Sequence, residues 1–261
     1  MGNEMRLIHA QRKPTSNVSE VVAHIQGVIW KHDLPPFRDR SMYVYIRKIY
    51  KRVCLFFVLK STSKRTRYLR QSISLTGLGT PTFNASLQGV LNVFTLFSNH
   101  VPRDALNNCE NICNSYGNHP GIDISNRYFS SIKNTPMEKR IPFEQHEDPH
   151  GILARLETPN YVHSNLNKVE YFERISKANG EMKYAVFYLQ MEAFKWTWTT
   201  RYTPIRPVQF NNGDIVEAQF LFLLVPIRRE KFQLQLVLQG VTRLSNAFSQ
   251  VKTGILTVNR N

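Results

Sequence analysis

A glutamate between two histidines forms the sequence pattern best suited to metal chemistry. The run His146-Glu147-Asp148-Pro149-His150 satisfies H-E-x-x-H, in which two imidazoles one helical turn apart bind zinc and the glutamate acts on a bound water. That chemistry requires a continuous helix, so that both imidazoles leave the same face. Pro149 would disrupt such a helix at a cost of about 3 kcal/mol, and Asp148-Pro149 favours a turn. We therefore predict a solvated polar loop with no bound metal, and we keep a zinc hydrolase using His146, Glu147 and His150 as a third alternative.

Positive charge is the second feature that could do chemistry, and it is unevenly distributed. The 261 residues include 34 Lys plus Arg against 19 Asp plus Glu, which gives a net charge of +15. No acidic residue lies between Asp39 and Asp104, although that stretch carries eleven positive charges from Arg40 to Arg103. A surface of this kind favours a polyanionic partner, either nucleic acid or an acidic membrane face.

The candidate phosphate-binding and base-stacking residues come from this basic stretch. We expect phosphates to be bound by Arg47, Lys48, Lys51, Arg52, Lys60, Lys64, Arg65, Arg67 and Arg70. Four tyrosines interleave with these charges, as in proteins that stack unpaired bases on aromatic rings: Tyr43, Tyr45, Tyr50 and Tyr68. For each of these rings taken singly, partial burial in a strand is the favoured explanation. The two basic clusters, at 51–52 and 64–67, are also spaced like a bipartite nuclear import signal.

The apolar patterns that must position these residues predict an α+β fold, with an antiparallel β-sheet body and three or four amphipathic helices. Helical spacing of apolar residues indicates the helices, which we place at 84–99, 101–117 and 163–180, with a short one at 18–30. Residues 42–60 fit a basic amphipathic helix or strands, and we favour strands because β-branched and aromatic residues dominate. Alternation indicates the remaining strands, which we place at 53–60, 66–75, 193–202, 214–225, 231–238 and 254–258.

The domain organisation follows from composition. Residues 1–41 are polar and predict a partly flexible N-terminal arm, and residues 42–261 predict a single domain with a loop-rich segment at 118–163. The most apolar run, Ala218 to Ile227, is far shorter than the roughly 20 residues that span a bilayer. The N-terminus also lacks the apolar stretch of a signal peptide. We therefore expect an intracellular protein that is not secreted and has no transmembrane segment.

In general outline the chain resembles the matrix proteins of plant rhabdoviruses. The resemblance rests on "HDLPPFRDRS", on "KRVCLFFVLKSTSKRTRYLR" and on overall charge. It implies a non-enzymatic viral structural protein, without catalytic residues or a cofactor, that binds ribonucleoprotein or RNA and an acidic membrane surface. It further implies self-assembly into a homo-oligomer, with a place in the virion, the host cytoplasm and the host nucleus. The budding peptide of that family would need a tyrosine where Arg38 stands.

A second function is open beside this matrix-like one. The same charges and tyrosines suit a viral movement or coat protein that binds single-stranded RNA or DNA without sequence preference. Both functions use the same basic surface. A single-strand binder would also contact unpaired bases there, whereas a matrix-like protein would also contact lipid headgroups.

Overall fold

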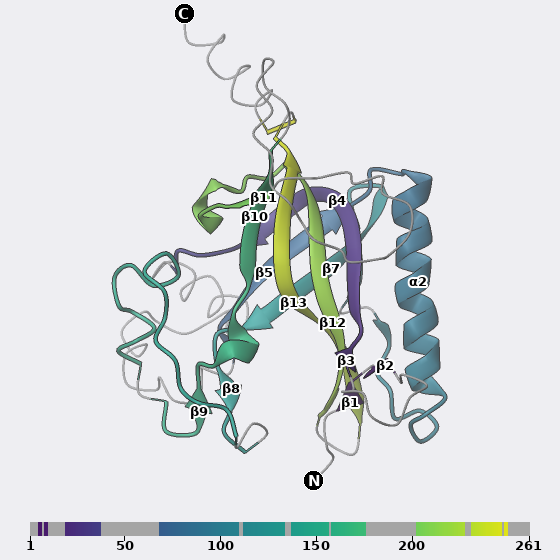
Figure 1. Ribbon diagram of the computed structural model, residues 1–261. Helices are drawn as coiled ribbons and strands as arrows, with labels where there is room; N and C mark the ends of the chain where they lie inside the picture. Colours follow the sequence, from purple (N-terminus) through teal and green to yellow (C-terminus); the bar gives the residue numbers. More distant parts are fainter. Residues whose placement is uncertain are drawn as a thin grey trace, which may run out of the picture.

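In the computed structural model, the described part of the chain forms a large β-sheet with a long helix beside it (Figure 1). The structure describes residues 5–6, 8–9, 19–37, 68–109, 112–133, 137–156, 158–175, 202–227, 231–246 and 248–249. The sheet has nine strands, of which eight follow the order β11-β10-β13-β12-β4-β5-β7-β6, while β1 pairs with β12. All neighbouring strands are antiparallel except β10 and β13, which run parallel. The sheet is therefore mixed.

The strands of the large sheet differ greatly in length. They are β1 (Met5–Arg6), β4 (Val22–Asp33), β5 (Arg70–Thr76), β6 (Cys113–Tyr116), β7 (His119–Arg127), β10 (Glu170–Arg174), β11 (Tyr202–Pro204), β12 (Ile215–Pro226) and β13 (Phe232–Ser245). Two small sheets pair β2 (Ile8–His9) with β3 (Ser19–Glu20) and β8 (Ser130–Ser131) with β9 (Tyr161–Val162). The helical elements are α2 (Pro81–Ser98) and the two 3₁₀ turns η4 (Asn165–Asn167) and η5 (Pro207–Gln209).

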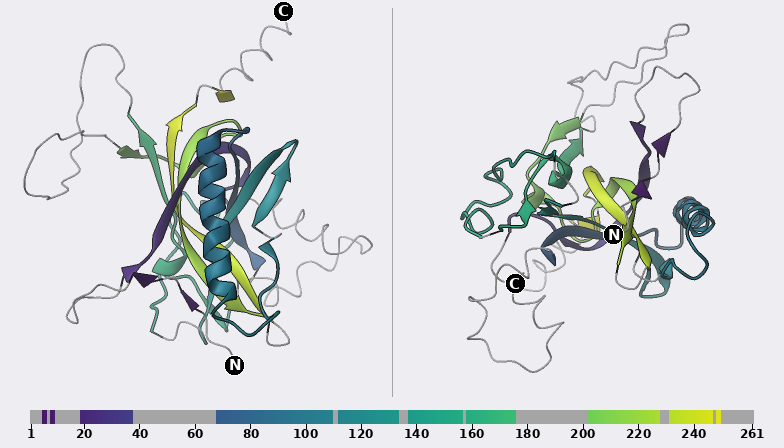
Figure 2. Two further views of the ribbon diagram at one scale, coloured as in Figure 1. Left: turned by 90° about the vertical axis from the view of Figure 1, so that its right-hand side faces the viewer. Right: turned by 90° about the horizontal axis from the view of Figure 1, so that it is seen from below.

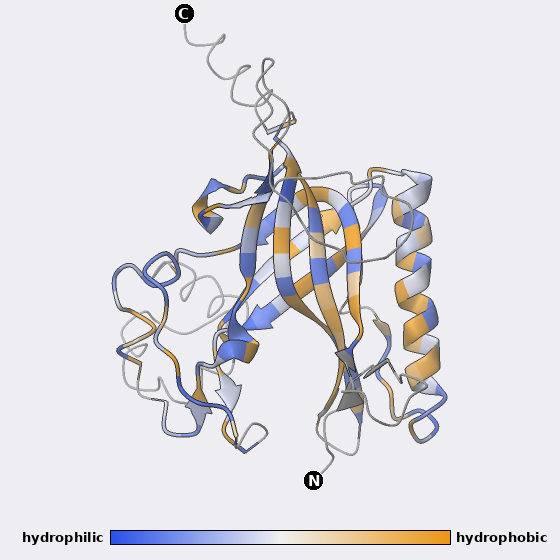
Figure 3. Cartoon of the chain, in the orientation of Figure 1, coloured by the Kyte–Doolittle hydropathy of each residue, from blue (hydrophilic) through white to orange (hydrophobic). Residues whose placement is uncertain are grey.

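The hydrophobic core lies between two parts of the same twisted sheet. In Figure 1, β5 and β7 pass behind β13 at a steep angle. Alternating apolar residues of β4, β5, β7, β12 and β13 belong to one buried cluster, and Figure 3 shows the corresponding alternation along β12 and β13. The amide Nδ2 of Asn126 on β7 donates to the carbonyl of Leu238 on β13 at 3.0 Å. This bond joins strands that are not neighbours in the sheet.

Helix α2 lies at one side of the sheet, and the loop-rich segment 137–163 lies at the other with β8 and β9 (Figures 1 and 2). Three residues on one face of α2 are buried, namely Phe83, Val90 and Phe97. Phe83 lies against the backbone of Gly77, where a Cβ atom would overlap its ring, and close to Gly27, where a Cβ atom would be 3.0 Å from the ring. The close approach of the helix to β4 and to the end of β5 therefore depends on glycine.

The predicted α+β fold with three or four amphipathic helices is wrong, because the structure is mostly β and α2 is the one long helix in the described residues. The helix expected at 84–99 is confirmed as α2, and the strands expected at 214–225 and 231–238 are confirmed as β12 and β13. Residues 101–109 and 112–117 instead form turns and β6, and residues 163–175 form η4 and β10. The short helix expected at 18–30 is replaced by β3 and β4.

The predicted loop-rich segment 118–163 contains the long strand β7, which is central to the core. The second strand of the predicted hairpin, 66–75, coincides with β5. Its expected partner, 53–60, lies outside the described residues, as do all of 42–60, all of 254–258 and all of 193–202 except Tyr202. No helix in the described residues has the length and hydrophobicity needed to cross a membrane.

Candidate anion-binding cleft

Two arginines face each other on adjacent strands of the sheet. Arg70 at the start of β5 and Arg127 at the end of β7 are direct cross-strand partners in antiparallel register. Side chains of directly opposite residues leave the same face of a sheet, so the two guanidinium groups share that face. Like charges in this position repel each other and destabilise the strand pair. A bound anion between them would remove that cost.

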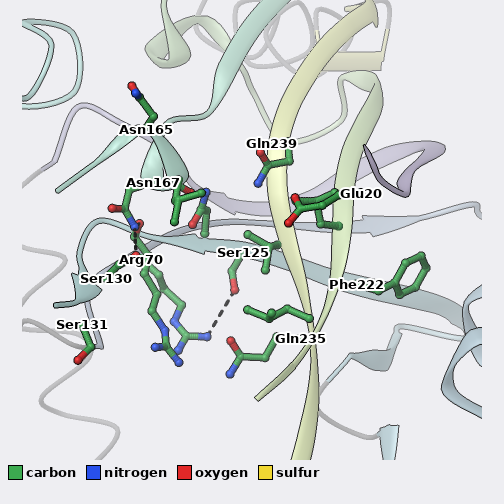
Figure 4. A pocket seen from close by; sticks show the side chains of 16 residues that line it. Glu20, Arg70, Ser125, Ser130, Ser131, Asn165, Asn167, Phe222, Gln235 and Gln239 are labelled. Carbon is green, nitrogen blue, oxygen red and sulfur yellow. Dashed lines mark hydrogen bonds between the residues drawn. The ribbon is translucent and has the colours of Figure 1, made fainter. Parts of the chain in front are cut away.

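The arginine pair opens into a cleft between two parts of the sheet, which we call the β7–β13 cleft. It comprises two adjoining cavities of about 200 and 350 Å³, both lined by Arg70, Ser125 and Gln235. Arg127 lines the smaller cavity, and Lys31 lines the larger one. Figure 4 shows the side chains of Arg70, Ser125 and Gln235 directed into the smaller cavity. The cleft therefore brings three positive charges to a surface of polar groups, most of them neutral.

The lining of the smaller cavity combines hydroxyl and amide groups with a strip of apolar residues. Arg70 Nη1 lies 3.4 Å from Ser125 Oγ, to which it donates. In the described residues the buried Nε atom of Arg127 has no hydrogen-bond acceptor, and no carboxylate forms an ion pair with this guanidinium. A guanidinium offers a planar fork of donors that fits two oxygens of a phosphate or carboxylate. Arg127 is thus placed to accept an anion from outside the chain.

Two carboxylates also line the cleft. Glu20 lies in the smaller cavity and Asp123 in the larger one. The carboxylate of Asp123 accepts a hydrogen bond from Ser74 Oγ at 2.5 Å and further bonds from Asn114 and Tyr116. These bonds hold the Asp123 carboxylate against side chains of the two neighbouring strands, β5 and β6.

Buried amides hold the walls of the cleft in place. Asn167 in η4 donates from Nδ2 to the carbonyl of Arg127 at 3.0 Å and to Ser130 Oγ at 2.9 Å (Figure 4). Asn126 donates to the carbonyls of Leu166 and Leu238, both at 3.0 Å. Because Asn126 and Asn167 are almost fully buried, these bonds are protected from water and fix the positions of β7, η4 and β13.

A stacked pair of rings, the exposed Trp30 and the part-buried Tyr116, lies on the same sheet. The register between β4 and β5 shifts between Ile29 and Lys31, so Trp30 sits in a bulge, and 48% of its surface is exposed. The Trp30 ring stacks on Tyr116 with centroids 5.9 Å apart and an interplanar angle of 28°. Burial and the hydrogen bond to Asp123 raise the pKa of Tyr116 to about 12. Trp30 was absent from the sequence-based candidates, since its segment was expected to be helical.

The predicted basic and aromatic site is described at only two of its positions. Arg70 lines both cavities, and part-buried Tyr68 lies two residues before it. The other candidates lie outside the described residues: Arg47, Lys48, Lys51, Arg52, Lys60, Lys64, Arg65, Arg67, Tyr43, Tyr45 and Tyr50. Sequence reasoning missed Arg127, because nothing in the chain links it to Arg70 until β5 and β7 pair.

The H-E-x-x-H segment forms turns and not a helix, as Pro149 predicts. The prediction of a solvated loop is wrong for its carboxylates, because Glu147 is 2% and Asp148 8% exposed. Asp148 accepts hydrogen bonds from the backbone amides of Ile152 and Ala154, at 2.7 and 2.9 Å. Glu147 accepts one from the amide of Glu144. No cluster of potential metal ligands occurs in the residues that the structure describes. The hydrogen bonds accepted by Glu147 and Asp148 instead stabilise the loop that contains them.

The fold and the cleft together define a mixed β-sheet protein with a polar groove lined by arginines. Comparisons with protein-family models, curated proteins and solved structures find no match to this chain. The resemblance to plant rhabdovirus matrix proteins therefore stays a prediction.

Proposed function

We propose that this protein is a non-enzymatic, matrix-like viral structural protein that binds the phosphates of a ribonucleoprotein or of an acidic membrane face. The observation that carries the proposal is the Arg70–Arg127 pair, two cationic forks opposed across adjacent strands in a cavity of about 200 Å³. Neutral hydroxyl and amide groups beside the pair suit the remaining oxygens of a phosphate. The net charge of +15 supplies long-range attraction to any polyanion.

On this proposal the cleft acts together with the basic stretch that precedes it. Arg70 follows Lys64, Arg65 and Arg67 by only a few residues in the sequence, and we propose that a polyanion seated in the cleft also contacts those charges. The protein would work in the virion, the host cytoplasm and the host nucleus, and would assemble as a homo-oligomer on its anionic partner. Binding through many phosphates is strongly salt-dependent.

The test is the salt dependence of binding by the full chain to a single-stranded RNA and, separately, to acidic vesicles. Changing Arg70 and Arg127 together to Gln should weaken binding to RNA and lower the slope of log affinity against log salt by about 0.7 for each phosphate that is no longer neutralised. The matched control changes Arg174 and Arg206 to Gln, because both are exposed arginines outside the cleft and the loss of charge is equal. Equal weakening in the two double variants would contradict a role for the cleft.

A second variant tests the basic stretch. Changing Lys51, Arg52, Lys64, Arg65 and Arg67 together to Ser should abolish binding to RNA and to acidic vesicles at physiological salt. If this variant binds both ligands as well as the parent does, the proposed function is wrong.

A further inference from the structure

We propose that the β7–β13 cleft and the Trp30–Tyr116 pair form one binding track for single-stranded nucleic acid, in which an unpaired base stacks on Trp30 and a phosphate lies between Arg70 and Arg127. This inference rests on the proposed function and narrows its partner from any phosphate polyanion to a strand with free bases. It is carried by the exposed tryptophan, by its stacked neighbour and by the continuity of the polar surface between them and the arginines.

The first step is the state of the aromatic pair. The Trp30 side chain is large and apolar, yet 48% of its surface is exposed, and its ring already stacks on Tyr116 at 28°. The hydrogen bond from the Tyr116 hydroxyl to Asp123 fixes the second ring of this stack. A nucleobase added to the open face of Trp30 would extend an aromatic stack that is already ordered, which lowers the entropic cost of binding.

The second step is the connection to the arginines. Lys31, next to Trp30, is the cross-strand partner of Ser74, and Ser74 lies on the same face of β5 as Arg70. The four residue steps from Ser74 to Arg70 span about 13 Å at the rise of a β-strand. Lys31 and Arg70 also line the same cavity. A phosphodiester strand could therefore follow the cleft from the tryptophan past Lys31 to the arginine pair.

The third step compares a single strand with a lipid surface as the ligand of the β7–β13 cleft, and the shape of the cleft disfavours the lipid surface. The arginine pair lies in a cleft between β5–β7 and β12–β13, where a thin, flexible strand can place a phosphate and a flat layer of headgroups cannot. A duplex has its bases paired and stacked, so it offers none to Trp30. Binding of a single strand with aromatic stacking and cationic phosphate contacts is the arrangement that both features fit.

The test compares Trp30→Ala and Trp30→Phe with the parent, all as the full chain, on three ligands. These are a single-stranded RNA of about 12 nucleotides, within the site sizes known for such binders, the same RNA as a duplex, and acidic vesicles. Trp30→Ala should weaken binding to the single strand by about tenfold, the effect of one base that no longer stacks. Binding to the duplex and to vesicles should change little, and Trp30→Phe should restore most of the affinity. A matched control is Phe248→Ala, because Phe248 is also an exposed aromatic residue at 57%.

Tryptophan fluorescence gives a second measurement that does not depend on affinity. Stacking of a base on Trp30 should quench part of the emission of the parent on RNA binding, and this part should be missing in Trp30→Phe. Equal binding of single strand by parent and Trp30→Ala, or equal quenching in parent and Trp30→Phe, would overturn the inference while leaving the proposed function intact. Failure of the parent to bind any polyanion at physiological salt would overturn the proposed function itself.

Discussion

Single side chains inside this protein carry hydrogen bonds whose removal can be measured, and the buried Tyr171 is one of them. Its hydroxyl donates to Gln71 Oε1 at 2.5 Å, and the amide of Gln71 donates to the carbonyl of Asn167 at 3.1 Å. Gln71 is completely buried, so water cannot replace a missing donor.

We therefore expect Tyr171→Phe to lower the free energy of unfolding by about 1–2 kcal/mol, since it leaves a buried acceptor unsatisfied. Urea denaturation followed by circular dichroism measures this. The control is Tyr161→Phe, because the hydroxyl of Tyr161 has no hydrogen bond among the described residues, and its unfolding midpoint should not move. Similar destabilisation in both variants would refute the hydrogen bond between Tyr171 and Gln71.

A second prediction at the residue scale concerns acid stability and His163. Its Nδ1 bonds the carbonyl of Tyr128 at 2.9 Å, and the ring is 2% exposed and stacked on Phe143. Burial lowers the pKa of His163 below its ordinary 6.5, so the unfolded chain takes up a proton before the folded one does. The stability of the fold should therefore fall as the pH drops from about 6.5 through the lowered pKa.

The variant His163→Asn keeps a donor for the Tyr128 carbonyl and removes the titration. Its unfolding free energy should be flatter than that of the parent between neutral pH and the acid transition, as measured by denaturant titrations at a series of pH values. Burial raises the pKa of Glu147 above its ordinary 4.5. The contribution of Glu147 to stability therefore changes in the opposite direction, increasing as the pH falls. The exposed His150→Asn is the control, and a slope as steep in His163→Asn as in this control would disprove the prediction.

At the scale of elements, two glycines at helix α2 should respond oppositely to the same change. Gly89 lies on its exposed side with open space where a Cβ atom would be added, whereas a Cβ on Gly77 would overlap Phe83. Gly89→Ala should raise the free energy of unfolding by about 0.5–1 kcal/mol, because alanine loses less backbone entropy in a helix. Gly77→Ala should lower it, since α2 must move away from β5. Thermal unfolding compares the two, and a stabilised Gly77→Ala would show that α2 does not pack as described.

Sequence patterns correctly predicted the elements in which the spacing of apolar residues matches the face that is buried in the structure. The alternation along β12 and the apolar stripe of α2 each match a face that is buried along the whole element. The segment containing Tyr171 has helix-like spacing, but it forms β10 because it pairs in parallel with β13, about 70 residues further along the chain. Long-range pairing overrides local preference there.

The site was less predictable than the fold for the same reason. Arg70 stands out in the sequence because it belongs to a stretch without acidic residues, whereas Arg127 follows an ordinary polar segment. The register of β5 against β7 brings the two together, and register is set by tertiary packing. Trp30 is exposed where the pairing of β4 with β5 shifts between Ile29 and Lys31. No pattern in the nearby sequence predicts that shift.

At the scale of the whole molecule, the excess positive charge should make stability and binding respond oppositely to salt. Folding brings charges of one sign closer together, and salt screens their repulsion over a distance of about 10 Å at 0.1 M and 3 Å at 1 M. The melting temperature of the free protein should therefore rise with sodium chloride over this range, while affinity for a polyanion falls.

The fivefold Ser variant of the basic stretch provides the matched comparison, because its net charge falls from +15 to +10. Its melting temperature should rise less with salt than that of the parent, as differential scanning fluorimetry can measure. An identical salt response in the two proteins would mean that the +15 charge is already neutralised within the fold.

The lengths of the outermost strands have a consequence for assembly. In the described part of the chain the sheet is bordered by β11, which has three residues and ends at Pro204, and by β6, which has four. Such stubs present few free amide and carbonyl groups, and proline presents no amide, so they are poor templates for adding a strand from another molecule. At these two edges, copies that polymerise would therefore meet through side chains, and contacts of that kind can be broken without unfolding the subunits.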